Sequence, residues 1–251
     1  MKRVAVSLLV ASFLPVAALP MMGQTTLSPT DQLYIQIDEA FTGTAAVSSA
    51  VLTGEVRTYA GSKDSSGEIT LTASADGSSS VVMQLDSGER SETQDTFANG
   101  QGCTWTASDG VTQTTAGPNC LVPVAWFLPE VSLFSAQQPA SNGTLSMETD
   151  SGKAQVLHWK MSPVPGLSAA MLSLLPSLGA YDLHINQVSD LPSSLSYSQH
   201  PDDNAADNIP VSVVFSDYRT VDGTEIPFHI QRYLNGTLSI DVTLSNAVIT
   251  H

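Results

Sequence analysis

The sequence contains few residues in the spacing of known catalytic motifs, and the histidines are the first candidates for a general base. His158, His184 and His229 fall in alternating segments that predict strands, and His251 is the last residue. A histidine within a strand more often bonds its neighbours in the sheet than acts as a general base, which needs a substrate within reach. The motifs Gly-x-Ser-x-Gly and His-Glu-x-x-His and a glycine-rich phosphate loop are missing. The sequence therefore predicts a protein that is not an enzyme.

A polar loop at residues 200–208 contains side chains of the kinds that bind cations. Its aspartates and asparagines offer the carboxylate and amide oxygens that calcium prefers. The loop lacks the spacing of an EF-hand, its glycine and its bidentate Glu. We therefore interpret it as a solvated turn between strands, and we expect neither a metal site nor a cofactor.

Cys103 and Cys120 are the only cysteines. An even pair that flanks a hairpin signal in an exported protein is typical of one structural disulfide, whereas a reactive dithiol needs the closer Cys-x-x-Cys spacing. We expect a Cys103–Cys120 bridge that stabilises the fold by about 3 kcal/mol, because it closes a short loop.

Two apolar segments interrupt the otherwise polar, alternating sequence. Residues 121–134 are almost continuously apolar, and Pro123 and Pro129 can each begin a helical turn. Residues 166–178 carry apolar side chains at helical spacing. Either segment can fill the core or line an apolar pocket, because both settings favour the same residue types. The candidate pocket or lid residues are Trp126, Phe127, Leu128, Val131, Phe134, Met171, Leu174 and Leu175.

The segments that must position these residues are short strands. Alternating stretches separated by Gly-containing turns, at a spacing of about ten residues, favour a meander, sandwich or barrel, because parallel strands need long crossovers. Residues 61–67 are expected to be one of the breaks. The strands predicted before the last meander are 51–59, 68–75, 80–86, 89–97, 103–106, 111–115, 144–149, 154–161, 181–188 and 193–199.

The last part of the chain predicts a three-stranded antiparallel meander with one apolar face. Its turns contain Asp222-Gly223 and Asn235-Gly236. A two-residue loop would mix the two faces, so we expect three-residue loops with a bulge at each glycine. Ile230 would then pair with Ile240, and Tyr218 with Ile226.

An amphipathic helix is predicted over residues 29–41, with Ser28 as the N-cap, Pro29 at the first position and Gly43 as the stop. Before it, Lys2 and Arg3 precede an apolar run and a region of small residues. This pattern predicts a secretory signal peptide over residues 1–23, followed by one domain over residues 24–251.

Charge and anchoring limit the partners and the compartment. The chain has nine Lys and Arg against 24 Asp and Glu, a net charge of −15, which becomes −17 once Lys2 and Arg3 are removed. Such a charge repels nucleic acid and anionic lipid surfaces, so nucleic acid is excluded as a partner. No cysteine lies near the cleavage site, and no later segment is apolar enough to span a membrane. We expect a periplasmic or extracellular protein without a lipid or transmembrane anchor, and a protein partner is left open.

The order of elements is informative as a whole. An exported N-terminal helix precedes antiparallel strands, a Pro-punctuated apolar segment, further strands and the meander, which contains Tyr-x-x-Val-x-Gly-x-x-x-Pro from Tyr218 to Pro227. In this the chain resembles the LolA-like superfamily of periplasmic lipoprotein carriers and outer-membrane lipoprotein-sorting proteins. The resemblance implies an α+β, predominantly antiparallel β fold, an incomplete, half-open β-barrel wrapped around two or three short helices that cover an apolar cavity. It also implies a ligand-handling Arg, for which Arg57 and Arg90 are the candidates.

These patterns favour a non-enzymatic, carrier-like protein that binds an apolar ligand, a lipid or an acyl chain. The alternative is a cell-envelope scaffold or interaction protein, which burial of Trp126 and Phe134 without an adjoining cavity would favour. A hydrolase comes third and would need a Ser or carboxylate within hydrogen-bond reach of His158 or His184 in a cleft.

Overall fold

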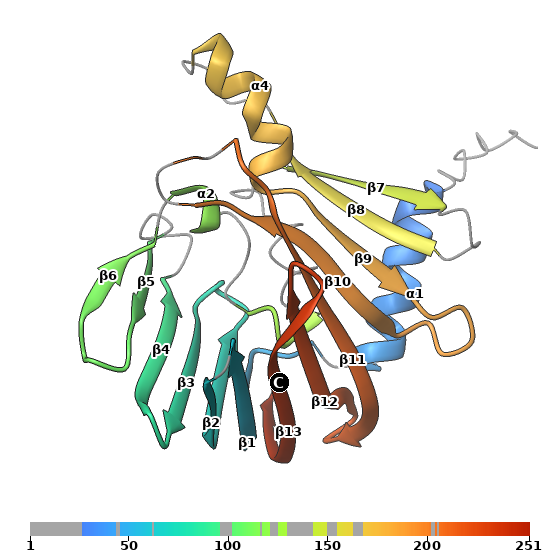
Figure 1. Ribbon diagram of the computed structural model, residues 1–251. Helices are drawn as coiled ribbons and strands as arrows, with labels where there is room; N and C mark the ends of the chain where they lie inside the picture. Colours follow the sequence, from blue (N-terminus) through green and yellow to red (C-terminus); the bar gives the residue numbers. More distant parts are fainter. Residues whose placement is uncertain are drawn as a thin grey trace, which may run out of the picture.

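Thirteen strands form one continuous antiparallel sheet in the computed structural model (Figure 1). The strand order is β6-β5-β4-β3-β2-β1-β13-β12-β11-β10-β9-β8-β7, so that the first and last strands of the chain are neighbours in the middle. The structure describes residues 27–43, 46–61, 63–95, 102–115, 117–120, 125–129, 143–149, 155–162, 168–201, 204 and 206–251.

The predicted strands are confirmed, with ends that move by a few residues. The first six are β1 (Ser49–Ala60), β2 (Lys63–Ser74), β3 (Ser79–Leu85), β4 (Gly88–Gln94), β5 (Cys103–Thr106) and β6 (Thr112–Thr114). The other seven are β7 (Gly143–Thr149), β8 (Gln155–Met161), β9 (Tyr181–Ile185), β10 (Pro192–Gln199), β11 (Ile209–Val221), β12 (Thr224–Leu234) and β13 (Thr237–Thr250).

The predicted break at residues 61–67 is wrong. Strand β2 already begins at Lys63, and Lys63 to Gly67 pair with β1. The polar composition of this stretch suggested a loop, but its backbone completes the ladder with β1, and pairing overrides weak local propensity.

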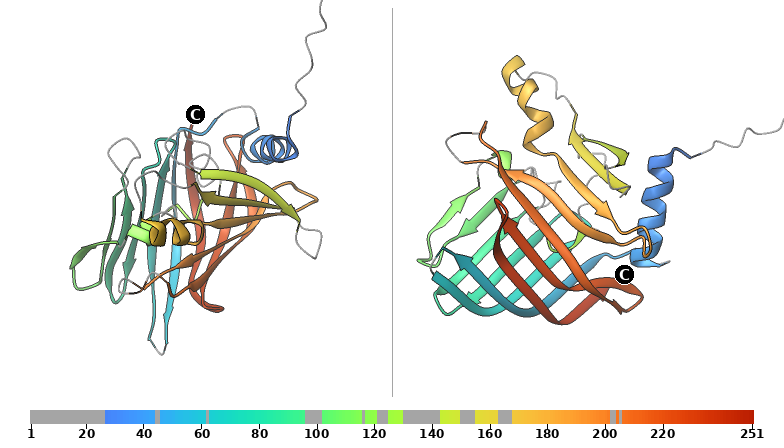
Figure 2. Two further views of the ribbon diagram at one scale, coloured as in Figure 1. Left: turned by 90° about the horizontal axis from the view of Figure 1, so that it is seen from above. Right: turned by 45° about the vertical axis from the view of Figure 1, so that its right-hand side comes forward.

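The sheet curls and stays open, with β6 and β7 as its two edges (Figure 2). This confirms the predicted half-open, predominantly antiparallel barrel. Alternation along the strands turns one side of each strand inward, and the inward side chains form the core. On β1 these include Leu52 and Val56, and on β12 Ile226, Phe228 and Ile230, all at most 5% exposed.

Helix α1 (Pro29–Thr42) follows the prediction closely. Ser28 accepts a hydrogen bond from the backbone of Asp31, whose carboxylate bonds back to Ser28, and Pro29 opens the first turn. The buried stripe Leu33, Ile37 and Phe41 packs on the sheet, where α1 contacts β12 and β7.

Two further helices lie in the described part of the chain, and both are short. Helix α2 (Gly117–Cys120) follows β6, and α4 (Ala169–Leu178) lies within the predicted stretch 166–178. Helix α4 projects away from the curled sheet in Figures 1 and 2 and contacts β8 and β10. No helix in the described part of the chain is long and apolar enough to cross a membrane.

The pairing predicted for the closing meander is wrong at both turns. Asp222 and Gly223 both have positive φ, as do Asn235 and Gly236, and each pair forms a two-residue turn. Such turns suit the twist of a hairpin better than the longer loops that we expected.

In the β12–β13 hairpin, the faces are kept apart by a bulge close to the turn. A bulge between Arg232 and Tyr233 shifts the β12–β13 register, so that Ile230 pairs with Val242 and Arg232 with Ile240. On β11, Asp217 has a φ of 54° and interrupts a ladder in which Tyr218 pairs with Pro227. The apolar residues of β12 therefore still face the core, although the β12–β13 register differs from the predicted one by two residues.

The predicted disulfide is present. Cys103 at the start of β5 is bridged to Cys120 at the end of α2, with Cα atoms 5.6 Å apart. Both cysteines are buried. The bridge ties the outer hairpin β5–β6 to the helix that follows it.

Candidate functional site

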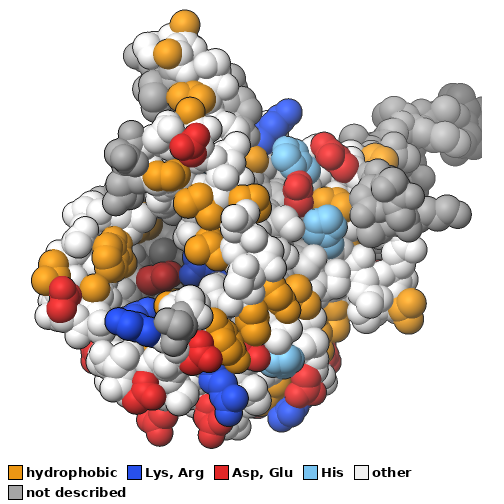
Figure 3. All heavy atoms as spheres, in the orientation of Figure 1, with side chains coloured by type: hydrophobic (Ala, Val, Ile, Leu, Met, Phe, Trp, Pro, Cys, Tyr) orange, Lys and Arg blue, Asp and Glu red, His pale blue; other side chains and the backbone are white. Residues whose placement is uncertain are grey.

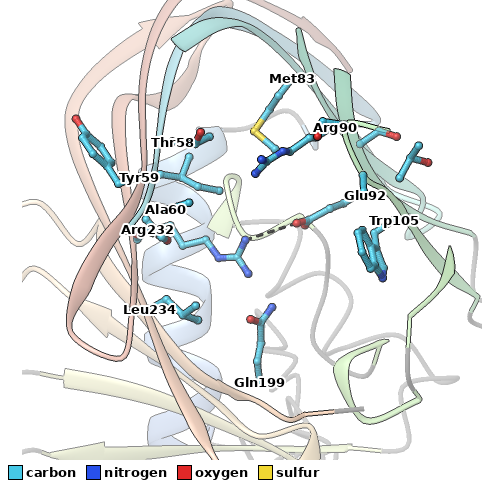
Figure 4. Close-up of a pocket in the computed structure, with 16 residues that line it drawn as sticks. Thr58, Tyr59, Ala60, Met83, Arg90, Glu92, Trp105, Gln199, Arg232 and Leu234 are labelled. Atoms are coloured by element: carbon cyan, nitrogen blue, oxygen red, sulfur yellow. Dashed lines mark hydrogen bonds and ion pairs between the residues drawn. The ribbon is translucent and has the colours of Figure 1, made fainter. Parts of the chain in front are cut away.

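A cavity of about 510 Å³ opens on the concave side of the sheet (Figure 4). Residues from seven strands, β1, β3, β4, β5, β10, β12 and β13, line it. The volume is in the range typical of sites for small molecules. In the space-filling view, the hollow contains charged side chains of both signs next to hydrophobic ones (Figure 3).

Cross-strand pairing explains which side chains meet here. Met83 on β3 pairs with Arg90 on β4, and Glu92 on β4 pairs with Trp105 on β5. On the other side, Arg232 on β12 pairs with Ile240 on β13. Paired residues of antiparallel strands share a face, so all of these side chains follow the inward side of the curl.

Part of the wall is apolar. Met83, Trp105, Leu234 and Ile240 line the cavity, and Met83 and Ile240 also belong to the hydrophobic core. The cavity is therefore continuous with the core.

The rest of the wall is polar, and Arg232 is its most buried charged member. Arg232 is only 7% exposed and lies 3.7 Å from Glu92, between Nη1 and Oε1. Its Nε has no hydrogen-bond partner. Burial works against its charge, but the interactions with Tyr197 and Glu92 outweigh this and raise the pKa of Arg232 above its usual value. Arg232 is therefore a cation at every physiological pH.

Trp126 connects the predicted apolar segment to this cavity. The Arg232 guanidinium lies 5.3 Å from the centre of the Trp126 ring, a cation–π contact. Trp126, Phe127 and Leu128 are at most 1% exposed and belong to the core. None of the three lines the 510 Å³ cavity, and Trp126 adjoins it only through Arg232. Their predicted role in an apolar pocket stays a prediction.

The remaining predicted pocket residues divide into two groups. Val131 and Phe134 lie outside the described residues, as do the side chains of Met171 and Leu175 in α4. Leu174 lies in α4 and is half-buried. The role of these residues likewise stays a prediction.

The two arginine candidates lie on opposite faces of the sheet. Arg90 lines the concave cavity. Arg57 lines a groove of about 550 Å³ on the other face, together with Glu55, Glu68 and Asp241. Of the two, only Arg90 is placed to meet a ligand inside the curl.

Two of the histidines, His158 and His229, form side-chain hydrogen bonds between neighbouring strands. His158 Nδ1 lies 2.6 Å from Asp182 Oδ1, so a carboxylate is within reach, but neither residue lines the cavity or the groove described above. His229 lies between Ser216, 3.1 Å from Nδ1, and Asp241, 2.8 Å from Nε2. Ser216 is exposed in the middle of β11 and also bonds the His229 carbonyl, which fits a ladder that stabilises the sheet.

Metal binding gains no support from the described residues. Among them, no group of three or more His, Cys, Asp or Glu side chains is arranged to hold a metal ion. Asp202 and Asp203 of the predicted polar loop lie outside the described residues.

Among the polar and aromatic residues at the cavity, sequence reasoning named only Arg90 and missed, among others, Glu92, Trp105, Gln199 and Arg232. A signal was available for Arg232. It follows Phe228 and Ile230 at two-residue spacing and is therefore a charge on the apolar side of its strand.

Comparisons with known proteins support the fold. No family model matches the chain, and no curated protein matches it in sequence. An outer-membrane lipoprotein-sorting protein domain from Vibrio parahaemolyticus has a similar structure, with a TM-score of 0.52 and 6% identity, over 87% of this chain and 91% of that one. A LolA superfamily protein from Nitrosomonas europaea gives 0.52 and 8%, over 88% and 94%. The chain has a LolA-like fold.

A third solved structure is also similar to this chain. A DUF1329 family protein from Desulfovibrio piger has a TM-score of 0.50 and 10% identity, over 89% of this chain and 94% of that one. At identities this low, the likeness shows the fold alone.

Proposed function

We propose that this protein is an exported, non-enzymatic binding protein that holds an apolar ligand, a lipid or an acyl chain, on the concave side of its sheet. The observation that carries the proposal is the 510 Å³ cavity, which has an apolar part continuous with the core. Burial of apolar ligand surface there would contribute roughly 25 cal/mol per Å² removed from water.

The names of the similar structures support the same function. One is a domain of a lipoprotein-sorting protein, and another belongs to the LolA superfamily. A carrier needs an apolar cavity, and the apolar part of the site described above agrees with this. Residues 126–128 would form the packed floor beneath the ligand, and Leu174 of α4 would contact the part of a ligand that extends out of the cavity.

Export is part of the proposal. Residues 1–23 would be removed as a signal peptide, leaving one domain over residues 24–251. The buried Cys103–Cys120 bridge is consistent with an oxidising compartment. The intact mass of the protein recovered from the periplasm or medium would identify the new N-terminus.

The alternative, a scaffold with a filled core, is less well supported. Trp126 is buried as that alternative requires, but its ring contacts Arg232, which lines the cavity. An adjoining cavity is therefore present where a scaffold would need none.

Native mass spectrometry of freshly purified protein, followed by lipid extraction, tests the proposal. We expect a co-purified apolar molecule, or binding of a fluorescent fatty-acid probe by the emptied protein. A protein that carries nothing and ignores the probe would rule out the proposed function.

A pair of variants on β1 locates the site. Ala60 lines the cavity and is exposed, so Ala60→Trp can fill the cavity without disturbing the core. Val51, 39% exposed, lies on the other side of β1, and Val51→Trp is the matched control. We expect Ala60→Trp to weaken probe binding at least about tenfold and Val51→Trp to leave it unchanged. Equal effects would place the ligand elsewhere.

A further inference from the structure

The charge inside the cavity is opposite to that of the whole protein. Arg90 and Arg232 line it, and Glu92 is the one carboxylate among the described lining residues. The wall thus carries a net charge of +1, whereas the chain carries −15. The positive charge is therefore local to the cavity wall, in a chain that is acidic as a whole.

Arg232 has unused hydrogen-bonding capacity in a buried position. A guanidinium has five N–H donors, and a charge out of contact with water needs partners for them. Tyr197 and Glu92 interact with Arg232, yet the Glu92 contact is long at 3.7 Å and Nε has no partner. Figure 4 shows the guanidinium pointing into the cavity. An anionic group there would supply the acceptors that Arg232 lacks.

Arg90 provides a second cation on the facing strand. Its side chain points into the cavity from β4 (Figure 4), and within the described part of the chain it makes no hydrogen bond or ion pair. Gln199 points into the same space from β10 and adds a neutral donor. Donors therefore converge from β4, β10 and β12.

Apolar groups lie next to these donors. Met83 neighbours Arg90 across β3 and β4, and Ile240 neighbours Arg232 across β12 and β13. Trp105 adds an aromatic face on β5. A molecule that is charged at one end and apolar along the rest of its length matches this distribution.

We propose that the ligand is an amphiphile whose single anionic headgroup, a carboxylate or a phosphate, is bound between Arg90 and Arg232. Its apolar part lies along Met83, Trp105 and Ile240. This inference rests on the proposed function and adds the chemical class of the ligand.

Three probes of equal chain length separate the headgroup from the chain: hexadecanoate, hexadecyl phosphate and neutral methyl hexadecanoate. Quenching of tryptophan fluorescence can follow binding, because Trp105 lines the cavity. We expect at least one anionic probe to bind at least about tenfold more tightly than the ester, since charge-assisted hydrogen bonds are strong. The tighter of the two anions identifies the headgroup as carboxylate or phosphate.

Arg90→Gln removes one cation while keeping a donor of similar size. We expect it to weaken binding of the anionic probes about tenfold and to leave the ester unchanged. Arg57→Gln on the outer face is the matched control and should change neither. Arg232→Gln should act as Arg90→Gln does, and the more accessible Arg90 keeps the test valid if the buried variant fails to fold.

The outcomes separate the two proposals. Equal binding of all three probes, unaffected by Arg90→Gln, would overturn the anionic headgroup and leave an apolar-ligand site. Failure of every probe to bind would overturn the proposed function itself.

Discussion

At the scale of single residues, Arg232 marks the boundary between core and cavity. Its guanidinium contacts the buried ring of Trp126 and also lines the cavity. A cation in this position needs its partners, because removal of one leaves a buried charge uncompensated. If this position served only to fill the core, an apolar residue would be more favourable than Arg232.

Gly67 is a residue at which the strands leave no room for a side chain. It lies in β2 between Val56 of β1 and Leu85 of β3, and an added Cβ would overlap the Gln84 carbonyl. We expect Gly67→Ala to lower the free energy of unfolding by at least about 2 kcal/mol in urea denaturation, because the backbone of β3 must shift. Its exposed neighbour offers a control: Ser66→Ala should change it by less than about 0.5 kcal/mol. Similar losses of unfolding free energy in the two variants would mean that β2 and β3 can move apart to accommodate the side chain at little cost.

Tyr181 makes stability sensitive to alkaline pH. Burial raises the pKa of Tyr181 above the ordinary value of about 10. The folded chain then holds the phenol proton more tightly than the unfolded chain. The corresponding stability is complete below about pH 10 and is lost as the pH rises above it.

Tyr181→Phe removes this proton. We expect the free energy of unfolding of the variant to fall less steeply above about pH 10, by up to about 1.4 kcal/mol per pH unit, than that of the wild type. Urea unfolding at about pH 8 and about pH 11 measures the two slopes. Parallel slopes would show that Tyr181 is not titrated on unfolding.

At the scale of elements, a turn and a bulge together set the register of the hairpin β12–β13. The Asn235-Gly236 turn fits the strand twist, and the bulge beside Arg232 restores the faces that the short turn would exchange. The bulge lies next to Arg232, so the irregularity that corrects the register also lies at the wall of the cavity.

The bridge between β5 and α2 stabilises an outer part of the sheet. Cys103 and Cys120 are 17 residues apart, and a loop of this size corresponds to about 3 kcal/mol in the chain-entropy account. We expect the double variant Cys103→Ser/Cys120→Ser to lose about this much in urea unfolding. A reductant should lower the stability of the wild type by a similar amount and have no effect on the double variant. An unchanged midpoint in both would show that the bridge contributes no stability.

At the scale of the whole molecule, β13 joins two halves of the sheet. It lies between β1 and β12, with six strands on either side. The N-terminal and C-terminal parts of the chain therefore form one cooperative unit only when the last strand is in place.

Removal of residues 237–251 should abolish the cooperative thermal transition in circular dichroism, because two open edges replace the centre of the sheet. Deletion of His251 alone is the control. It removes one exposed hydrogen bond, to the Asp222 carbonyl, and should lower Tm by at most about 3 °C. A truncated chain that still unfolds cooperatively would mean that one half folds alone.

The sequence by itself determined the local features of this protein. Period-two alternation, Gly-containing turns, the capping residues of α1 and the paired cysteines each act through neighbours in the chain, so the strands, the helix and the disulfide could be predicted. The resemblance added the half-open barrel. The register of the β12–β13 hairpin was not predicted, because a turn one residue shorter than expected is compensated by a bulge between Arg232 and Tyr233, which the sequence does not mark.

The cavity was decided by the tertiary structure alone. Arg90, Glu92 and Arg232 are separated by up to 142 residues in the chain and meet only because β4 and β12 curl toward one another. The sequence marked Trp126 as unusual but not that an arginine from a distant strand would lie over its ring. Curvature brings distant inward-facing residues together, and curvature depends on the accumulated twist and bulges of all thirteen strands.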